Sequence, residues 1–279
     1  MKFKKLTTVL LIALFLSGLS LLLYPTLSNY WNTLHATRAV ANYTGLVSQL
    51  DDSSYERLLR QARSYNQKIL SRADKMHPSE TEKAQYPKML HIEGTQVMGS
   101  IEIPAIDLQL PIFHGAEESV LQNGVGHVEW SSLPVGGEST HCVLSGHRGL
   151  PSAKLFTDLD RLAQGDVFLL QILDETLAYE VDQILTVKPE EVEALQIVPG
   201  EDYCTLVTCT PYGVNTHRLL VRGHRIELQA AQNTLRITAD AMQIDPAVVA
   251  PVLAFPLLLI LLVWLLIGTH KKSKPSTKK

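Results

Sequence analysis

Two long uncharged apolar runs stand near the two ends of the chain. One covers residues 6–23 directly after three lysines, and the other covers 247–267 shortly before a lysine-rich tail. Each run has about 20 residues, which as a helix matches the ~30 Å hydrocarbon layer of a membrane. A cleaved signal peptide is the alternative for the first run, but the absence of a small-residue cleavage pattern near Tyr24 favours an anchor. The pattern therefore predicts two transmembrane helices with short basic ends, 1–5 and 268–279.

Between the runs, the segment 24–94 is predicted to be largely helical. Apolar residues recur at helical spacing within 46–70, and Ser53 with Glu56 forms a capping-box pattern. The recurring residues are Leu58, Ala62, Tyr65 and Ile69. By contrast, 73–94 is polar and contains two prolines, so we interpret it as a linker or as a flexible flap that serves as a lid.

From Met98 the pattern changes to short stretches with a two-residue period, which is typical of strands. The predicted strands are 101–103, 108–112, 141–145, 167–173, 177–181, 203–209 and 219–226. Many short strands with little helix between them predict a mainly antiparallel β-barrel or sandwich. We place this domain at 95–230 and a linker at 231–246.

The charged residues are distributed differently between the two apolar runs and outside them. All 28 acidic residues lie between the runs, whereas eight of the 25 basic residues lie in the two ends. The positive-inside rule places the basic ends in the cytoplasm and 24–246 outside the membrane. That outer portion has 17 basic and 28 acidic residues, so its formal charge is −11. A surface of this sign repels phosphate backbones, which disfavours nucleic-acid binding.

Three cysteines form an odd and sparse set for an exported domain, so at least one thiol is unpaired. A buried thiol that acts as a small hydrophobic side chain is one explanation. Cys209 offers another, because it ends a strand-like run just before the turn sequence Thr-Pro-Tyr-Gly and can reach solvent. The two-residue period turns Cys204 to the opposite face of that strand. Cys209 is therefore the candidate nucleophile, and Cys142 is assigned to the core.

His147 is the candidate acid–base partner of this thiol. It lies where a strand runs into a turn, with glycines close by on both sides. A structural role is the alternative, because the chain contains ten histidines. His217 and His224 also compete with it, since both are nearer to Cys209 in the sequence. However, His217 precedes Arg218 directly, so the two face opposite sides of a strand.

Arg218 is the candidate cation of the site. It follows Cys209 after one short loop and opens the next strand, so antiparallel pairing would bring its guanidinium close to the thiol. A surface arginine that pairs with a carboxylate is an equally consistent interpretation. A zinc site is not indicated, because the sequence has no C-x-x-C or H-x-x-x-H pair of ligands.

At these residues the sequence resembles the sortases, a family of cysteine transpeptidases. The segment Thr-Leu-Val-Thr-Cys that ends at Cys209 is similar to their TLxTC signature. The segment around His147 resembles that of class C, the pilus-assembly subgroup, as does the layout with two membrane spans. Further similar segments are 126–127, 133–137, 151–156 and 215–223.

The resemblance implies an eight-stranded sortase β-barrel with N-terminal helices, and chemistry without a metal or organic cofactor. It implies Cys209 as nucleophile, His147 as acid and base, and Arg218 as stabiliser of the substrate and of the developing oxyanion. The substrate would carry an LPxTG-like sorting signal, cleaved through a cysteine thioester and joined to a lysine amine of another pilin subunit. The expected partners are therefore pilin subunits, a lysine-bearing pilin acceptor and the membrane of a Gram-positive bacterium.

Three other functions are weighed against this one. A housekeeping-type sortase would attach surface proteins to cell-wall peptide, and a cysteine peptidase would release its product to water. A membrane-tethered β-domain that acts as an assembly scaffold would not need Cys209.

One feature departs from the class C pattern. The lid of these enzymes commonly carries an Asp-Pro-aromatic motif that covers the cysteine, whereas 74–79 here reads Asp-Lys-Met-His-Pro-Ser. In these enzymes the aspartate of the lid binds the arginine of the site. We do not expect that contact here, either with a flap or without one.

Overall fold

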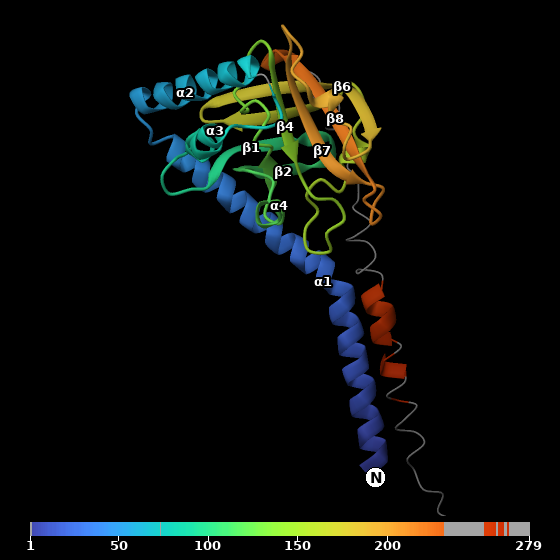
Figure 1. Cartoon of the computed structure of the whole chain (residues 1–279). Helices are drawn as coiled ribbons and strands as arrows, with labels where there is room; N and C mark the ends of the chain where they lie inside the picture. The colour runs from blue at the N-terminus through green and yellow to red at the C-terminus, as the bar shows by residue number, and fades with distance from the viewer. Residues whose placement is uncertain (1, 73, 232–253, 261, 265–266, 268–279) are drawn as a thin grey trace, which may run out of the picture. The chain divides into compact units, whose positions relative to one another are not determined.

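The computed structural model describes residues 2–72, 74–231, 254–260, 262–264 and 267 (Figure 1). The chain forms two compact units, one within 31–240 and the other made of the two chain ends, 1–30 and 241–279.

The N-terminal helix α1 (Lys2–Val47) extends well beyond the predicted span at 6–23. Its first part exposes large apolar side chains such as Leu6, Leu10 and Leu14, as expected for a helix whose surroundings are lipid. Among the described residues, one helix, Leu6–Val47, is long and apolar enough to cross a membrane.

The second predicted span, 247–267, lies partly outside the described residues. Of its described residues, 254–260 and 262–264 are helical. The second transmembrane helix therefore stays a prediction.

Eight strands form one closed barrel, which confirms the predicted β-barrel (Figure 1). The strands are β1 (Val97–Ile103), β2 (Leu108–His114), β3 (Val125–His127), β4 (Thr140–Ser145), β5 (Val167–Ile172), β6 (Glu175–Val187), β7 (Asp202–Thr210) and β8 (His217–Ile226). Around the barrel they follow the order β1, β2, β3, β4, β7, β8, β6 and β5.

The pairing is mainly antiparallel, as predicted, with two exceptions. β2 pairs with β3 and β4 pairs with β7 in parallel. β3 was not predicted, because three residues are too short to show a two-residue period. The parallel pair of β4 and β7 has the larger consequence, since it places the carboxyl ends of both strands side by side.

Alternate residues of the strands fill the interior of the barrel with apolar side chains. Ile101 and Ile103 on β1, Phe168 and Leu170 on β5, and Leu206 on β7 are fully buried. Burial of each such side chain contributes about 1.5–3 kcal/mol to folding. This packing fixes β7 in the barrel wall and so fixes the residues at its end.

The last part of α1 is attached to the barrel through the buried residue Tyr43. Its hydroxyl donates to the carbonyl oxygen of Met98 at 3.0 Å and accepts from the amide of Leu173 at 2.7 Å. One side chain thus links the helix to β1 and to the turn between β5 and β6.

The helix predicted at 46–70 is present as α2 (Asp52–Ser71), but the predicted cap is wrong. Asp51 is the N-cap, and its carboxylate accepts from the amide of Ser54 at 2.6 Å. Aspartate caps a helix as well as serine does, so the helix begins before Ser53.

The segment 73–94 contains more regular structure than the predicted linker or flap. The helix α3 (Glu80–Gln85) begins with a capping box at Ser79. Tyr86 follows it, and its buried hydroxyl lies 2.9 Å from Nδ1 of His127 on β3. The helix was missed because six residues are too few to show a helical period.

Candidate active site

The three free cysteines occupy different environments. Cys142 on β4 and Cys204 on β7 are buried and pair in register across the two strands. Cys209 is half-buried, one residue before the end of β7. The predicted alternation is therefore confirmed, because Cys204 lies in the core while Cys209 reaches the surface.

The parallel pairing of β4 with β7 brings His147 beside Cys209. The register of the two strands continues past the end of β4, because the amide of Gly146 donates to the carbonyl oxygen of Val207 at 3.0 Å. The hydroxyl of Thr208 then donates to the carbonyl oxygen of Gly146 at 2.8 Å. Extending this register by one residue sets His147 opposite Cys209.

The antiparallel pairing of β7 with β8 brings Arg218 to the other side of the thiol. Arg218 is the register partner of Cys209. Residues directly opposite in such a pair share one face, with Cβ atoms about 5 Å apart. In the described part of the chain, the Arg218 guanidinium bonds to the carbonyl oxygens of His217 (3.2 Å) and Asn215 (3.4 Å) rather than to a carboxylate. The arginine is therefore not held in a surface ion pair.

The loop that carries His147 is fastened to the end of β7 by its next residue, Arg148. Nη1 of Arg148 donates to the Thr210 hydroxyl at 3.3 Å, and the same guanidinium forms an ion pair with Asp160. On the other side, the amide of Phe156 donates to the carbonyl oxygen of His147 at 3.0 Å. These contacts hold the backbone around the imidazole, a role for Arg148 that no motif had indicated.

The two competing histidines lie elsewhere on β8. His217 pairs with Thr210 and precedes Arg218, so its side chain faces the other side of the sheet. His224 pairs with Tyr203, near the opposite end of β7 from Cys209. Of the three histidines considered, His147 is the one that follows the end of β4 beside the end of β7.

A carboxylate that the sequence did not indicate contacts the imidazole. Oε2 of Glu118 lies 3.1 Å from Nε2 of His147. Glu118 is the first residue of the short helix α4 (Glu118–Leu121), which connects β2 to β3. A hydrogen bond from Gln122, followed by the charge of His147, lowers the pKa of this carboxyl. No sequence signal predicted this contact, because Glu118 lies in no motif and 29 residues before His147.

The stretch 74–79 makes local contacts. The carboxylate of Asp74 lies 2.9 Å from Nδ1 of His77 and accepts from the amide of Met76 at 3.2 Å. Asp74 is thus engaged within its own turn rather than with Arg218, in agreement with the missing lid motif. The residues that the structure describes include no group of three or more His, Cys, Asp or Glu arranged to hold a metal ion.

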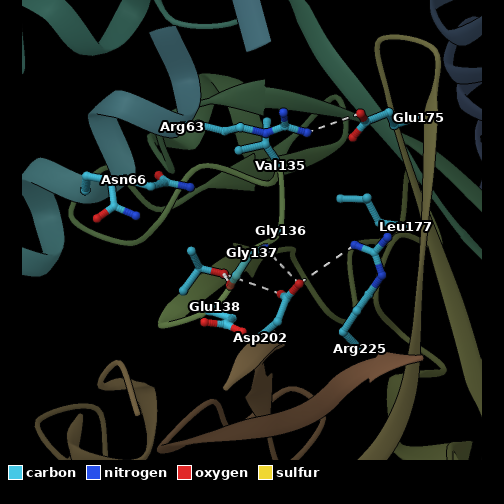
Figure 2. A pocket seen from close by; sticks show the side chains of 12 residues that line it. Arg63, Asn66, Val135, Gly136, Gly137, Glu138, Glu175, Leu177, Asp202 and Arg225 are labelled. Atoms are coloured by element: carbon cyan, nitrogen blue, oxygen red, sulfur yellow. Dashed lines mark hydrogen bonds and ion pairs between the residues drawn. The ribbon is translucent and has the colours of Figure 1, made fainter. Parts of the chain in front are cut away.

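A separate cavity of about 500 Å³ opens near the start of β7 (Figure 2). Asp202 lies on its wall and accepts hydrogen bonds from the Gly137 amide (2.9 Å) and the Tyr179 hydroxyl (3.0 Å). Burial raises the pKa of this carboxyl. Asp202 and Cys209 are separated by most of β7, on the order of 20 Å, so this cavity is not part of the candidate active site.

The fold and the site together define a class of protein. A β-barrel with a half-buried thiol near a strand end, an arginine as its partner on one neighbouring strand and a histidine just after the other, has the groups that cysteine enzymes use for acyl transfer. Comparison with known families agrees, since a family model described as "Sortase domain" matches residues 101–226. The crystal structure of sortase C1 from Streptococcus agalactiae is 53% identical, with a TM-score of 0.66, over 68% of this chain and 98% of that one. The chain belongs to the sortase family of cysteine transpeptidases.

Other similar proteins are also sortases. Sortase C of Streptococcus pneumoniae, whose structure was described in terms of catalysis and pilin substrate specificity, is 46% identical over 68% of this chain and 97% of that one, with a TM-score of 0.61. Sortase A of S. agalactiae is 34% identical over 41% of this chain and 47% of its own length. The match to sortase A of Bacillus anthracis, at 29% identity, covers 50% of this chain and 64% of that protein. The chain thus spans about half to two thirds of these two relatives.

Proposed function

We propose that this protein is a membrane-anchored transpeptidase that joins pilin subunits. In this proposal it cleaves an LPxTG-like sorting signal and transfers the threonine carbonyl to a lysine amine of another subunit. The observation that carries the proposal is the position of Cys209, which is the register partner of Arg218 on β8 and lies next to Thr208, whose hydroxyl bonds to the residue before His147. The similarity to sortase C structures, one of them described for its pilin specificity, supports pilin as the substrate class.

The first step forms a thioester. The Cys209 thiolate attacks the threonine carbonyl carbon, and the negative oxygen of the tetrahedral intermediate accepts hydrogen bonds from the Arg218 guanidinium. The bond between threonine and glycine then breaks, and the His147 imidazolium gives its proton to the leaving amine.

The second step returns the enzyme to its starting state. The lysine amine attacks the thioester carbonyl, and His147 takes the proton that this nitrogen loses. The carbon–sulfur bond breaks, which restores the thiolate and leaves an isopeptide bond. No metal or organic cofactor is needed for either step.

The choice of acceptor amine tests this function. Full-length protein in detergent is incubated with a sorting-signal peptide and two competing acceptors, a pilin domain and a cell-wall peptide amine. The masses of the products are measured by mass spectrometry. We expect the isopeptide-linked pilin product, and no thioester or product from Cys209→Ala. A product on the wall peptide would favour a housekeeping-type sortase, which is the main competing function. Release to water would indicate a peptidase, and a fully active Cys209→Ala variant would refute the cysteine mechanism.

We also propose that both chain ends lie in the cytoplasm and that 24–246 lies outside. The basic flanks of the two apolar runs support this topology. We expect a cysteine introduced by Ser273→Cys in a Cys209→Ala background to react with a membrane-impermeant thiol reagent after permeabilisation and not before it. Labelling in intact cells would place the C-terminal tail outside and contradict the second crossing.

A further inference from the structure

The contact between Glu118 and His147 assigns a role to each nitrogen of the imidazole. Oε2 of Glu118 lies 3.1 Å from Nε2, and a carboxylate at that distance accepts a hydrogen bond from an N–H. Nε2 then carries a proton in both the neutral and the charged ring. The nitrogen that remains free to exchange a proton is Nδ1.

The carboxylate of Glu118 is itself held in place. Its other oxygen, Oε1, accepts a hydrogen bond from Nε2 of Gln122 at 3.0 Å, one turn farther along the chain. This contact leaves Oε2 directed to the imidazole. The lowered pKa of the Glu118 carboxyl means that it is ionised at neutral pH.

The other charges near His147 do not duplicate this role. Arg218 on β8 carries a positive charge and cannot accept a hydrogen bond from the ring, and the neighbouring Arg148 is already paired with Asp160. The Cys209 thiolate is consumed when the thioester forms. Among the residues that the structure describes, Glu118 is the carboxylate that contacts the ring.

We propose that Glu118 is a positioning residue for the transpeptidation, through its hydrogen bond to Nε2 of His147. This inference rests on the proposed function. The carboxylate fixes the ring so that Nδ1 gives the proton to the leaving amine and takes it from the attacking lysine amine, and it stabilises the imidazolium. Because the Glu118 side chain is 66% exposed, solvent screens the interaction and its effect is modest.

Three variants of the full-length protein test this role. Glu118→Gln removes the negative charge but keeps nearly the same shape, and Glu118→Asp keeps the charge on a shorter side chain. Glu117→Gln is the control, because it removes an exposed charge one residue away. For each, kcat and KM of thioester formation are measured between pH 5 and 9 at low and at high salt, together with Tm. NMR of the His147 ring carbons reports which nitrogen carries the proton.

We expect Glu118→Gln to lower kcat about two- to fivefold at low salt with KM unchanged, as for an exposed ion pair. The loss should shrink in 1 M salt, where the Debye length is about 3 Å. The size of the loss should vary with pH, and the ring should lose its preference for the Nε2–H form. Glu118→Asp should recover part of kcat, and Glu117→Gln should behave like the unmodified protein.

The inference is overturned by a Glu118→Gln variant whose kcat, pH profile and ring tautomer match the unmodified protein. An equal loss in Glu117→Gln, or a loss that follows Tm and ignores salt and pH, would also overturn it. If the unmodified protein formed no Cys209-dependent thioester, the proposed function itself would fall, and that result is distinct from any effect of Glu118.

Discussion

At the scale of single residues, position within one strand separates two chemically identical thiols. Cys204 is fully buried, and this burial raises the pKa of its thiol, so it remains protonated and inert. Cys209, five residues later on β7, faces the other side of the sheet at the rim of the barrel. The reactivity of a thiol on β7 therefore depends on which face of the strand its side chain occupies and on how close it lies to the strand end.

The same reasoning predicts different outcomes for two neighbouring histidines. His147→Ala should lower kcat/KM for transpeptidation by at least about 100-fold, because an acid–base group typically contributes 10²–10⁴. His217→Ala should stay within about threefold of the unmodified protein, because that side chain faces the other side of β8. Steady-state rates with a sorting-signal peptide and an acceptor amine measure both. A larger loss for His217→Ala than for His147→Ala would reverse the assignment.

At the scale of elements, the site exists because β7 has two different neighbours. Antiparallel β8 returns directly from a short turn and supplies Arg218, whereas parallel β4 comes from more than 50 residues earlier and supplies His147. The Thr208 hydroxyl, 2% exposed, bonds the β4 extension to β7 at Gly146. This buried side-chain hydrogen bond, next to the thiol, is thus one of the contacts that hold the backbone before the imidazole.

We therefore expect Thr208→Val to reduce both activity and stability. Loss of the hydroxyl leaves the Gly146 carbonyl oxygen without this partner and should lower the free energy of unfolding by about 1–3 kcal/mol. A displaced imidazole should lower kcat about 10- to 100-fold. Thr205→Val is the matched control, because its buried hydroxyl lies 2.7 Å from Nε2 of His141, away from the site. Chemical denaturation and kinetics of both variants separate the two effects, and equal loss of activity in both would contradict this role for Thr208.

At the scale of the whole molecule, burial of polar groups makes stability depend on pH. His114 donates from Nε2 to the carbonyl oxygen of Met89 at 2.7 Å in a part-buried setting beside Tyr86. Burial lowers the pKa of His114 from 6.5 to about 4. The unfolded chain therefore binds a proton at this residue at a higher pH than the folded chain does. The resulting stability is complete above pH 6.5 and is lost as the pH falls towards 4.

The barrel should consequently lose on the order of 3 kcal/mol of stability from this one group between pH 7.5 and 4. His114→Gln keeps a donor for Met89 and should show a smaller loss, whereas the exposed His77→Gln should behave like the unmodified protein. Urea denaturation at several pH values measures the difference. An unchanged pH dependence in His114→Gln would show that the imidazole is not the group responsible.

The sequence by itself determined the features that depend on neighbouring residues. A two-residue period predicted seven of the eight strands, and a strand end followed by a turn singled out Cys209. The apolar run at 6–23 predicted a helix long enough to span a membrane, and the structure shows that this helix continues to Val47. The short elements β3 and α3 were missed, because they contain too few residues to show a repeating pattern of apolar positions.

Only the tertiary structure decided which strands became neighbours. The parallel partnership of β4 with β7 brings His147 to Cys209, and the position of α4 brings Glu118 to His147. Strand pairing over more than 50 residues is chosen by how the whole barrel closes and buries its apolar side chains. Periodicity reports only which face of a strand is apolar, so it identifies the residues able to do chemistry but not the groups that surround them.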